Sequence, residues 1–120
     1  MHHYPWLEAY LLEKTGCVQQ YKIEWASMRY LIGGKEFART GEDKEGREII
    51  NLKLEPLRGE FLREHYEEIV PGYYANKTHW NSVDLNGSVP DDLMREMCDE
   101  SYRLVLGGLT KKAQREILGE

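Results

Sequence analysis

The chain has 120 residues, of which 41% are hydrophobic and 31% are charged, a composition typical of a folded globular domain and not of a disordered or fibrous chain. Its 16 basic and 21 acidic residues sum to −5, which excludes a domain that coats nucleic acid through positive charge over its whole surface. This length closes one hydrophobic core, so we expect a single domain over residues 1–120.

No apolar run approaches the ~18 residues of a membrane span. The N-terminus also lacks the basic start and apolar core of an export signal. We therefore expect a cytoplasmic protein with no membrane partner.

The N-terminal half predicts a helix followed by three strands. Pro5 suits the first turn of a helix whose apolar residues recur at three- and four-residue spacing, and Gly16 ends that helix. Alternation over residues 28–32, a Gly33-Gly34 turn and a return strand over residues 36–40 predict a β-hairpin. A charged turn then leads to a third strand over residues 48–54, with its apolar residues on one face.

The C-terminal half predicts a helix from Pro56, an irregular or edge strand over residues 69–74, and a strand over residues 80–85. The longest helix starts at Pro90 and ends at Gly107-Gly108, with Cys98 on its buried stripe and Asp92, Glu96 and Asp99 on a solvated face. Thr110 caps a short last helix. Strands grouped as hairpins favour an α+β fold in two layers, with an antiparallel sheet and helices on one face.

The familiar catalytic templates are absent. The sequence has no nucleophile elbow, phosphate-binding P-loop, zinc-protease helix or dinucleotide fingerprint. Cys17 and Cys98 are far apart and form no Cys/His cluster, although a reactive thiol at Cys17 stays an alternative. We therefore expect no metal, no cofactor and no enzymatic activity. The catalytic alternative needs His79 to meet a carboxylate in a closed pocket.

Residues 73–82 form the densest cluster of functional residue types, with aromatic rings, amides, a lysine and a histidine before a strand. Loops held by a rigid scaffold often carry binding residues of this kind. The structural interpretation stays open beside the functional one. It makes Trp80 a core anchor and Asn76 a cap, and it places Lys77 and His79 on the solvated side of a turn.

The motifs around this cluster resemble those of the MmcQ/YjbR family, and the resemblance covers nearly the whole chain in the right order. The matching motifs are Gly33-Gly34-Lys35, Phe37-Ala38, Asn51-Leu52-Lys53, Pro71-Gly72-Tyr73, Asn76-Lys77, His79-Trp80-Asn81, Val83-Asp84-Leu85, Asn86-Gly87-Ser88-Val89-Pro90-Asp91, Glu100-Ser101-Tyr102 and Leu109-Thr110-Lys111-Lys112.

The resemblance implies a small bacterial domain of uncharacterised function with the order α-β3-α-β2-α. Its members are often labelled DNA-binding because the sheet and its hairpins look like a double wing, which is a fold analogy. This sequence departs from such a wing in the turn over residues 42–48, where four acids stand beside Lys44 and Arg47.

Two functions remain open on this basis. The first is a DNA-binding module with a local basic face, and the alternative is a protein- or small-ligand-binding domain without nucleic-acid affinity, which would use the sheet face or the loop over residues 73–80. If the family shares a binding surface, its matched positions are Lys53, Asn76, Lys77, His79, Trp80 and Asn81. In the nucleic-acid hypothesis Lys35 and Arg39 join Lys53 and Lys77 as phosphate contacts, while His79, Trp80 and the tyrosines stack on bases.

Overall fold

The computed structural model describes residues 2–72 and 76–120, so Tyr73 and Tyr74 of the predicted cluster lie outside the described residues. The helices are α1 (Leu7–Leu12), α2 (Pro56–His65), α3 (Asp91–Gly107) and α4 (Lys111–Leu118), with a short 3-10 turn η1 (Ile23–Trp25). The strands are β1 (Val18–Lys22), β2 (Ser27–Ile32), β3 (Lys35–Glu42), β4 (Glu48–Lys53), β5 (Ile69–Pro71) and β6 (Trp80–Asp84).

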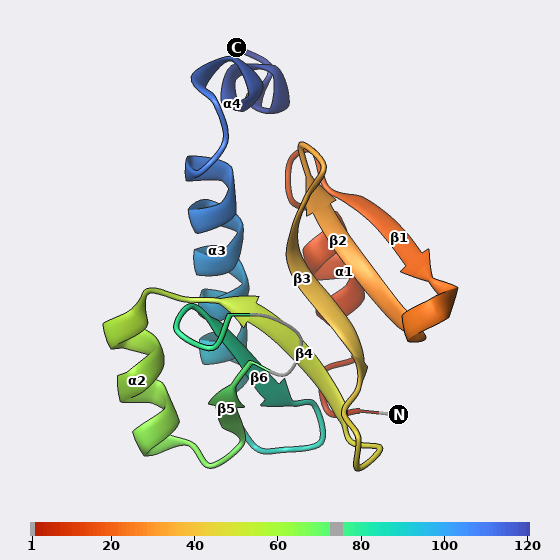
Figure 1. Cartoon of the computed structure of the whole chain (residues 1–120), viewed down its shortest axis with the longest axis vertical. Coiled ribbons are helices and arrows are strands. Elements are labelled where there is room, and N and C mark those ends of the chain that lie inside the picture. Colours follow the sequence, from red (N-terminus) through yellow and green to blue (C-terminus); the bar gives the residue numbers. More distant parts are fainter. Residues whose placement is uncertain (1, 73–75) are drawn as a thin grey trace.

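The six strands form one antiparallel sheet in the order β1-β2-β3-β4-β6-β5. Helices α1 and α3 lie on one face of this sheet, α3 packs on β3 and β4, and α2 lies against β5 (Figure 1). None of the described helices covers the other face, which we call the open face. This arrangement confirms the predicted α+β class. None of the described helices is long and apolar enough to cross a membrane.

The sequence did not predict strand β1 or the short turn η1 that follows it. Strand β1 pairs with β2 over Val18–Lys22 at the edge of the sheet, and its residues are exposed or half-buried. An edge strand with no fully buried side chain does not need to alternate apolar and polar residues. The sequence of residues 18–22 therefore lacks the alternation that predicts a strand. The predicted three-stranded unit before α2 is therefore four-stranded.

The core lies between the sheet and α3. Ile50 and Leu52 of β4 are completely buried, as are Met94, Met97 and Cys98 of α3. Burial raises the pKa of Cys98 to about 12, so this thiol stays protonated and behaves as a small apolar side chain, as predicted. Burial also raises the pKa of the Cys17 thiol, which argues against a reactive thiolate there.

The acidic side of α3 is only partly solvated. Asp92 and Glu96 are exposed as predicted, but Asp99 accepts hydrogen bonds from the Tyr10 hydroxyl (2.7 Å) and the Lys14 ammonium (2.5 Å). The Asp99 side chain is still 46% exposed, so it lies at the edge of the solvated face, where α1 packs beside this turn of α3 and supplies both donors. Burial and the bond to Asp99 together raise the pKa of Tyr10 to about 12.

Helix α4 and the residue before it, Leu109, pack against two turns of the chain that contain Gly16 and Gly33. A Cβ at Gly16 would lie 2.8 Å from Ile117, and one at Gly33 would lie 2.9 Å from Leu109. Both glycines have positive φ, so these positions need glycine for conformation as well as for space. Thr110 caps the helix, as predicted, by accepting the Ala113 N–H (3.1 Å).

Two consecutive residues of α3 hold the sheet and α2 together. The Ser101 hydroxyl donates to the Phe37 carbonyl (2.5 Å) and accepts the Lys53 N–H (2.8 Å), so it bridges β3 and β4 just beyond their last paired residues, Ala38 and Leu52. The neighbouring Glu100 is 5% exposed. It accepts the Glu55 N–H at the start of α2 (2.9 Å) and pairs with Arg58 (2.7 Å).

We expect Ser101→Ala to lower the free energy of unfolding by about 2–3 kcal/mol, because it leaves the buried Phe37 carbonyl and the Lys53 N–H without their partner. Urea denaturation followed by circular dichroism measures the change. The matched control is Ser88→Ala, because the Ser88 side chain is exposed and its hydroxyl binds Glu68, and there the loss should be about 1 kcal/mol or less. Equal, small losses in both variants would show that the bridge does not support the sheet.

Candidate functional site

A continuous row of polar side chains crosses the open face. Strand register places Gln20, Arg29, Arg39, Asn51 and Ser82 side by side, on five neighbouring strands. Side chains alternate between the two faces of a sheet, so these five point away from the apolar layer that Ile50 and Leu52 form. The row is rich in hydrogen-bond donors, which suits the recognition of anionic groups.

A bulge in β3 brings a carboxylate into this row. Tyr30 pairs with Ala38, but the next pair is Leu31 with Glu36, so Phe37 is an extra residue in β3. Phe37 turns toward α3, where its ring packs edge-on against Tyr102 with centroids 5.4 Å apart. The bulge thereby returns Glu36 to the open face.

Glu36 is shared by two arginines. One of its carboxylate oxygens, Oε1, lies 2.8 Å from the Arg29 Nε and 2.9 Å from an Arg39 terminal nitrogen. Arg29 also donates to the Gln20 side-chain carbonyl (2.7 Å). The three charged side chains are only 13–20% exposed, so solvent screens them less than it screens surface ion pairs. Two guanidinium groups and one carboxylate leave one surplus positive charge.

Trp25 covers this charged group. Its ring centroid lies 4.4 Å from the Arg39 guanidinium carbon and 5.7 Å from that of Arg29, and the Lys22 ammonium lies 5.2 Å from the same ring. Ala26, at φ +48°, ends η1 in a left-handed conformation before β2 begins. Trp25 stays 48% exposed, so it presents an aromatic surface to solvent over three cations.

Asn51 is completely buried in the middle of the row. Its side-chain carbonyl accepts the Ser82 hydroxyl (3.0 Å), while its side-chain amide nitrogen has no hydrogen-bond partner among the described residues. An unpaired buried donor costs free energy, and a group of this kind in a native structure calls for a reason. Asn51 and Ser82 are both buried, so this part of the row lies beneath the molecular surface.

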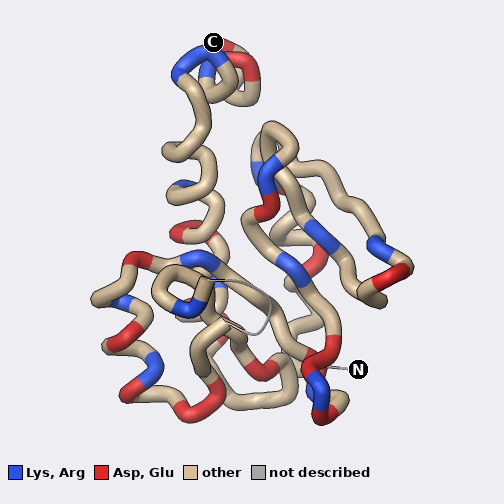
Figure 2. Tube along the Cα trace, viewed as in Figure 1, with Lys and Arg blue, Asp and Glu red and all other residues tan. Residues whose placement is uncertain are grey.

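The structure brings several of the predicted site residues onto this side of the molecule. Arg39 lies in the polar row, and Lys53 and Trp80 are register partners in the next row of the same face. Lys77 is exposed and lines a cavity of about 350 Å³ that reaches Ser82. Figure 2 shows lysine and arginine positions spread over the open face, whereas the β3–β4 hairpin and the loops near it are rich in acids.

The other predicted residues have local structural roles. Asn81 is buried on the opposite face of β6, where its side-chain carbonyl accepts a guanidinium N–H of Arg63 in α2. Asn76 closes a turn by accepting the Thr78 N–H (2.7 Å), and His79 accepts the Leu54 N–H through its backbone carbonyl (2.8 Å). Lys35 is exposed beside the Gly33-Gly34 turn, at the end of the sheet.

The basic surface has an acidic boundary. The cavity that Lys77 lines also contains Lys44 and Arg47, but five carboxylates surround these three cations. The acidic residues are Asp43, Glu45, Glu67, Glu68 and Asp84. The open face is therefore basic over β2, β3 and the end of β4, and it turns acidic toward the β3–β4 hairpin.

Trp25, Arg29 and Asn51 are site residues that sequence reasoning missed. A signal for Asn51 was present, because it is a single polar residue within the apolar run of β4. Arg29 and Arg39 occupy the polar positions of a predicted hairpin, but their pairing through Glu36 depends on the bulge. Nothing in the sequence pattern indicates that Trp25 folds back over them.

The motif Pro71-Gly72 also has a structural explanation. The Gly72 N–H donates to the Trp80 carbonyl (2.7 Å), and a Cβ at position 72 would lie 2.8 Å from the Trp80 Cβ. Glycine therefore lets the segment after β5 approach β6 closely enough for this bond. The indole of Trp80, half-buried beside Lys53, is held at the open face by this contact.

Comparison with known proteins places this fold and these motifs in one family. The uncharacterized protein YbdF of Escherichia coli O157:H7 is 36% identical over 88 residues, which cover 73% of this chain and 71% of YbdF. The uncharacterized protein YjbR of Escherichia coli K12 is 29% identical over 106 residues, or 88% of this chain and 89% of that protein.

A solved structure agrees with these sequence relatives. The crystal structure of the Deinococcus radiodurans protein DR2400, with a DUF419 domain, superposes with a TM-score of 0.84 at 31% identity and covers 99% of this chain and 89% of that one. The family model named YjbR matches residues 12–104. The chain therefore belongs to the YjbR family.

Proposed function

We propose that the open face binds single-stranded nucleic acid and that the protein acts as a binding module without catalytic chemistry. The observation that carries the proposal is the half-exposed Trp25 ring stacked over Arg39 at 4.4 Å, beside Arg29 and the polar row. Proteins that bind single strands combine an aromatic platform for bases with cations that follow the phosphates. The open face has both.

The charge of the site favours a phosphate-bearing ligand. Arg29, Arg39 and Glu36 leave one positive charge in a poorly solvated cluster. Lys53 follows in the neighbouring row, and Lys77 is exposed on the same side. Donors of these kinds make most contacts to phosphate and sugar oxygens in nucleic-acid complexes.

The shape of the face favours a single strand over a duplex. Duplex recognition in the major groove needs a helix or a two-stranded ribbon that projects into it. None of the described helices covers the open face, and the hairpin between β3 and β4 carries four acids that repel a phosphate backbone. A single strand can instead lie over Trp25, Arg29 and Arg39, at the side of η1, β2 and β3, and keep clear of that hairpin.

Two residues of the predicted cluster hold their loop in place through hydrogen bonds. His79 uses its backbone carbonyl to accept the Leu54 N–H, and Asn76 uses its side chain to close a turn. Both hydrogen bonds shape the loop before β6, so these residues act as scaffold for Trp80 and Lys77.

Replacing the aromatic platform should weaken binding strongly. We expect Trp25→Ala to make the binding free energy for a labelled single strand of about 12 nucleotides less favourable by about 1–3 kcal/mol, because base stacking on the indole is lost. Trp25→Phe should recover part of the loss. Fluorescence anisotropy at low salt measures both, with circular dichroism as the test of folding. Binding weaker than ~100 μM by the wild-type protein would contradict nucleic-acid recognition and favour the protein- or small-ligand alternative.

The salt dependence should identify the lysines that contact phosphates. For Lys53→Ala and for Lys77→Ala, we expect the slope of log affinity against log salt to shrink by about 0.7 each, since each phosphate contact releases counterions from a single strand. Lys44→Ala is the matched control, because it removes the same charge from the acidic hairpin and should leave the slope unchanged. Equal changes in all three variants would indicate unspecific charge attraction.

A further inference from the structure

Strand β1 forms an uncovered edge of the sheet. It comes first in the strand order, and Figure 1 shows none of the described elements beyond it. The backbone N–H and C=O groups on its outer side therefore have no partner strand among the described residues. An edge of this kind is a template for another β-strand, and natural proteins blunt such edges with short strands, proline, charged side chains or a covering element.

The opposite edge of the sheet, β5, has these protections, and β1 does not. Strand β5 has three residues and ends in Pro71, which has no N–H to donate, and α2 lies against it. Strand β1 has five residues and contains neither proline nor an acidic residue. Its one charged residue, Lys22, is half-buried, with its ammonium 5.2 Å from the centroid of the Trp25 ring. The outer edge of β1 is therefore open to pairing.

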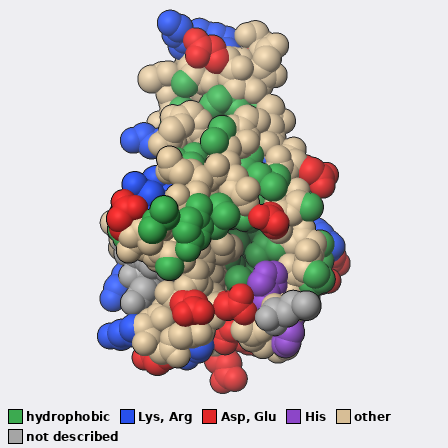
Figure 3. All heavy atoms as spheres, turned by 90° about the vertical axis from the view of Figure 1, so that its right-hand side faces the viewer, with side chains coloured by type: hydrophobic (Ala, Val, Ile, Leu, Met, Phe, Trp, Pro, Cys, Tyr) green, Lys and Arg blue, Asp and Glu red, His purple; other side chains and the backbone are tan. Residues whose placement is uncertain are grey.

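Apolar side chains gather at the same edge. Among the described residues, four of the nine large hydrophobic side chains that are exposed belong to β1 and η1, and Ile23 is the most exposed of them at 81%. The other three are Val18, Tyr21 and Trp25. Figure 3 views the molecule from this side and shows hydrophobic side chains clustered there. A cluster of exposed apolar side chains beside unpaired backbone indicates an interaction surface.

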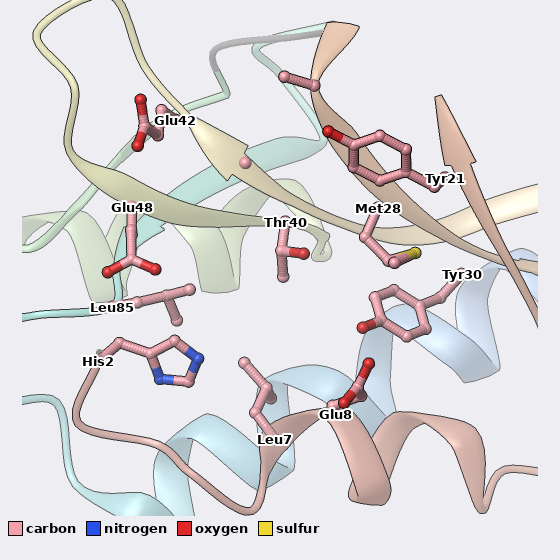
Figure 4. Close-up of a pocket in the computed structure, with 12 residues that line it drawn as sticks. His2, Leu7, Glu8, Tyr21, Met28, Tyr30, Thr40, Glu42, Glu48 and Leu85 are labelled. Carbon is pink, nitrogen blue, oxygen red and sulfur yellow. The ribbon is translucent and has the colours of Figure 1, made fainter. Parts of the chain in front are cut away.

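Both faces of β1 offer contacts to a strand at this edge. On the side of α1, Figure 4 shows the Tyr21 ring near Met28, its register partner, at a cavity of about 360 Å³. On the open face, the Gln20 side-chain carbonyl accepts an N–H of Arg29 (2.7 Å), while the amide group of the same side chain donates to none of the described residues. An aromatic ring on one face and a hydrogen-bond donor on the other are thus available at the edge.

The sequence of β1 is complementary to itself in antiparallel pairing. A two-fold axis at Gln20 pairs all five residues, because Gln20 then faces its own copy, Gln19 faces Tyr21, and Val18 faces Lys22. Each Gln20 amide can donate to the side-chain carbonyl of the other Gln20. The two lysines lie at opposite ends of the pairing, so no like charges stand directly opposite each other.

We propose that β1 pairs with β1 of a second copy of the chain, so that two molecules form a dimer with one continuous antiparallel sheet. The self-complementary pairing at Gln20 is the reason for assigning the edge to a copy of the same chain. The two-fold axis stands perpendicular to the sheet, and it therefore leaves both open faces on the same side of the dimer.

Sedimentation velocity tests the dimer. We expect the wild-type chain to dimerise with a Kd on the order of 10–100 μM, as for a small and reversible interface. A chain that stays monomeric up to ~500 μM would overturn the proposal and leave this edge to an extended peptide of another protein. The solution contains no nucleic acid, so the outcome is independent of the function proposed above.

Charge substitutions at the axis test the pairing itself. Gln20→Lys and Gln20→Glu should each weaken self-association about three- to tenfold, because like charges then stand directly opposite each other, and an equimolar mixture of the two variants should recover the wild-type affinity. Gln20→Glu keeps an acceptor for Arg29, and circular dichroism checks folding. The matched control is Val70→Lys at the β5 edge, which should dimerise like the wild-type chain. Unchanged dimerisation in both Gln20 variants, or no recovery in the mixture, would refute the pairing.

Cross-linking tests the register. Gln20→Cys should form a disulfide between two copies under mild oxidation, since paired Cα atoms lie about 4.5–5.5 Å apart, within disulfide reach. Gln19→Cys is the control, because Gln19 faces Tyr21 and not its own copy. Both variants carry Cys17→Ser, which leaves the buried Cys98 as the one native thiol. A disulfide in the Gln19 variant and none in the Gln20 variant would contradict a two-fold axis at Gln20.

Discussion

The Ser101 hydroxyl is the contact on which both faces of the sheet depend. Beyond the Ala38–Leu52 pair the two central strands separate, and this hydroxyl takes the place of the missing ladder bond by joining the Phe37 carbonyl to the Lys53 N–H. The bulge at Phe37 lies at the same point. A helix side chain thus stabilises the irregularity that directs Glu36 to the open face, and the neighbouring Glu100 fixes the start of α2.

The sheet separates charge by the alternation of its side chains. In β3, Arg39 faces the polar row and Thr40 faces the side of the sheet that α1 covers, although they are adjacent in the chain. The net charge of −5 does not describe the open face, which is basic over β2, β3 and the end of β4 and acidic toward the β3–β4 hairpin.

The fold was largely predictable because local sequence patterns indicate most of its helices and strands. The Gly33-Gly34 turn, the apolar alternation of β4 and the periodic stripe of α3 each specify their element without help from distant residues. Strand β1 was missed because pairing with β2 defines it, and the contacts of Asp99 were missed because its partners come from α1. Both errors concern tertiary contacts.

The candidate site was less predictable for the same physical reason. Arg39, Lys53 and Trp80 were predicted from residue type and from the family resemblance and lie on the open face, but Asn81 faces the other way because a strand alternates at every residue. The group of Trp25, Arg29 and Glu36 forms only when a 3-10 turn, a bulge and a hairpin meet. Residues that only the tertiary structure brings together have no regular spacing in the sequence that would identify them as a site.

The attachment of α4 through Gly16 and Gly33 makes this helix the least secured part of the described fold. None of its residues is buried, and its contact with those glycines comes from Ile117 together with Leu109 just before it. Segments with so little buried apolar surface open at a free energy well below that of global unfolding. The amides of α4 should therefore exchange with solvent long before those of β3 and β4, and each opening uncovers the Gly33-Gly34 turn while the sheet stays intact.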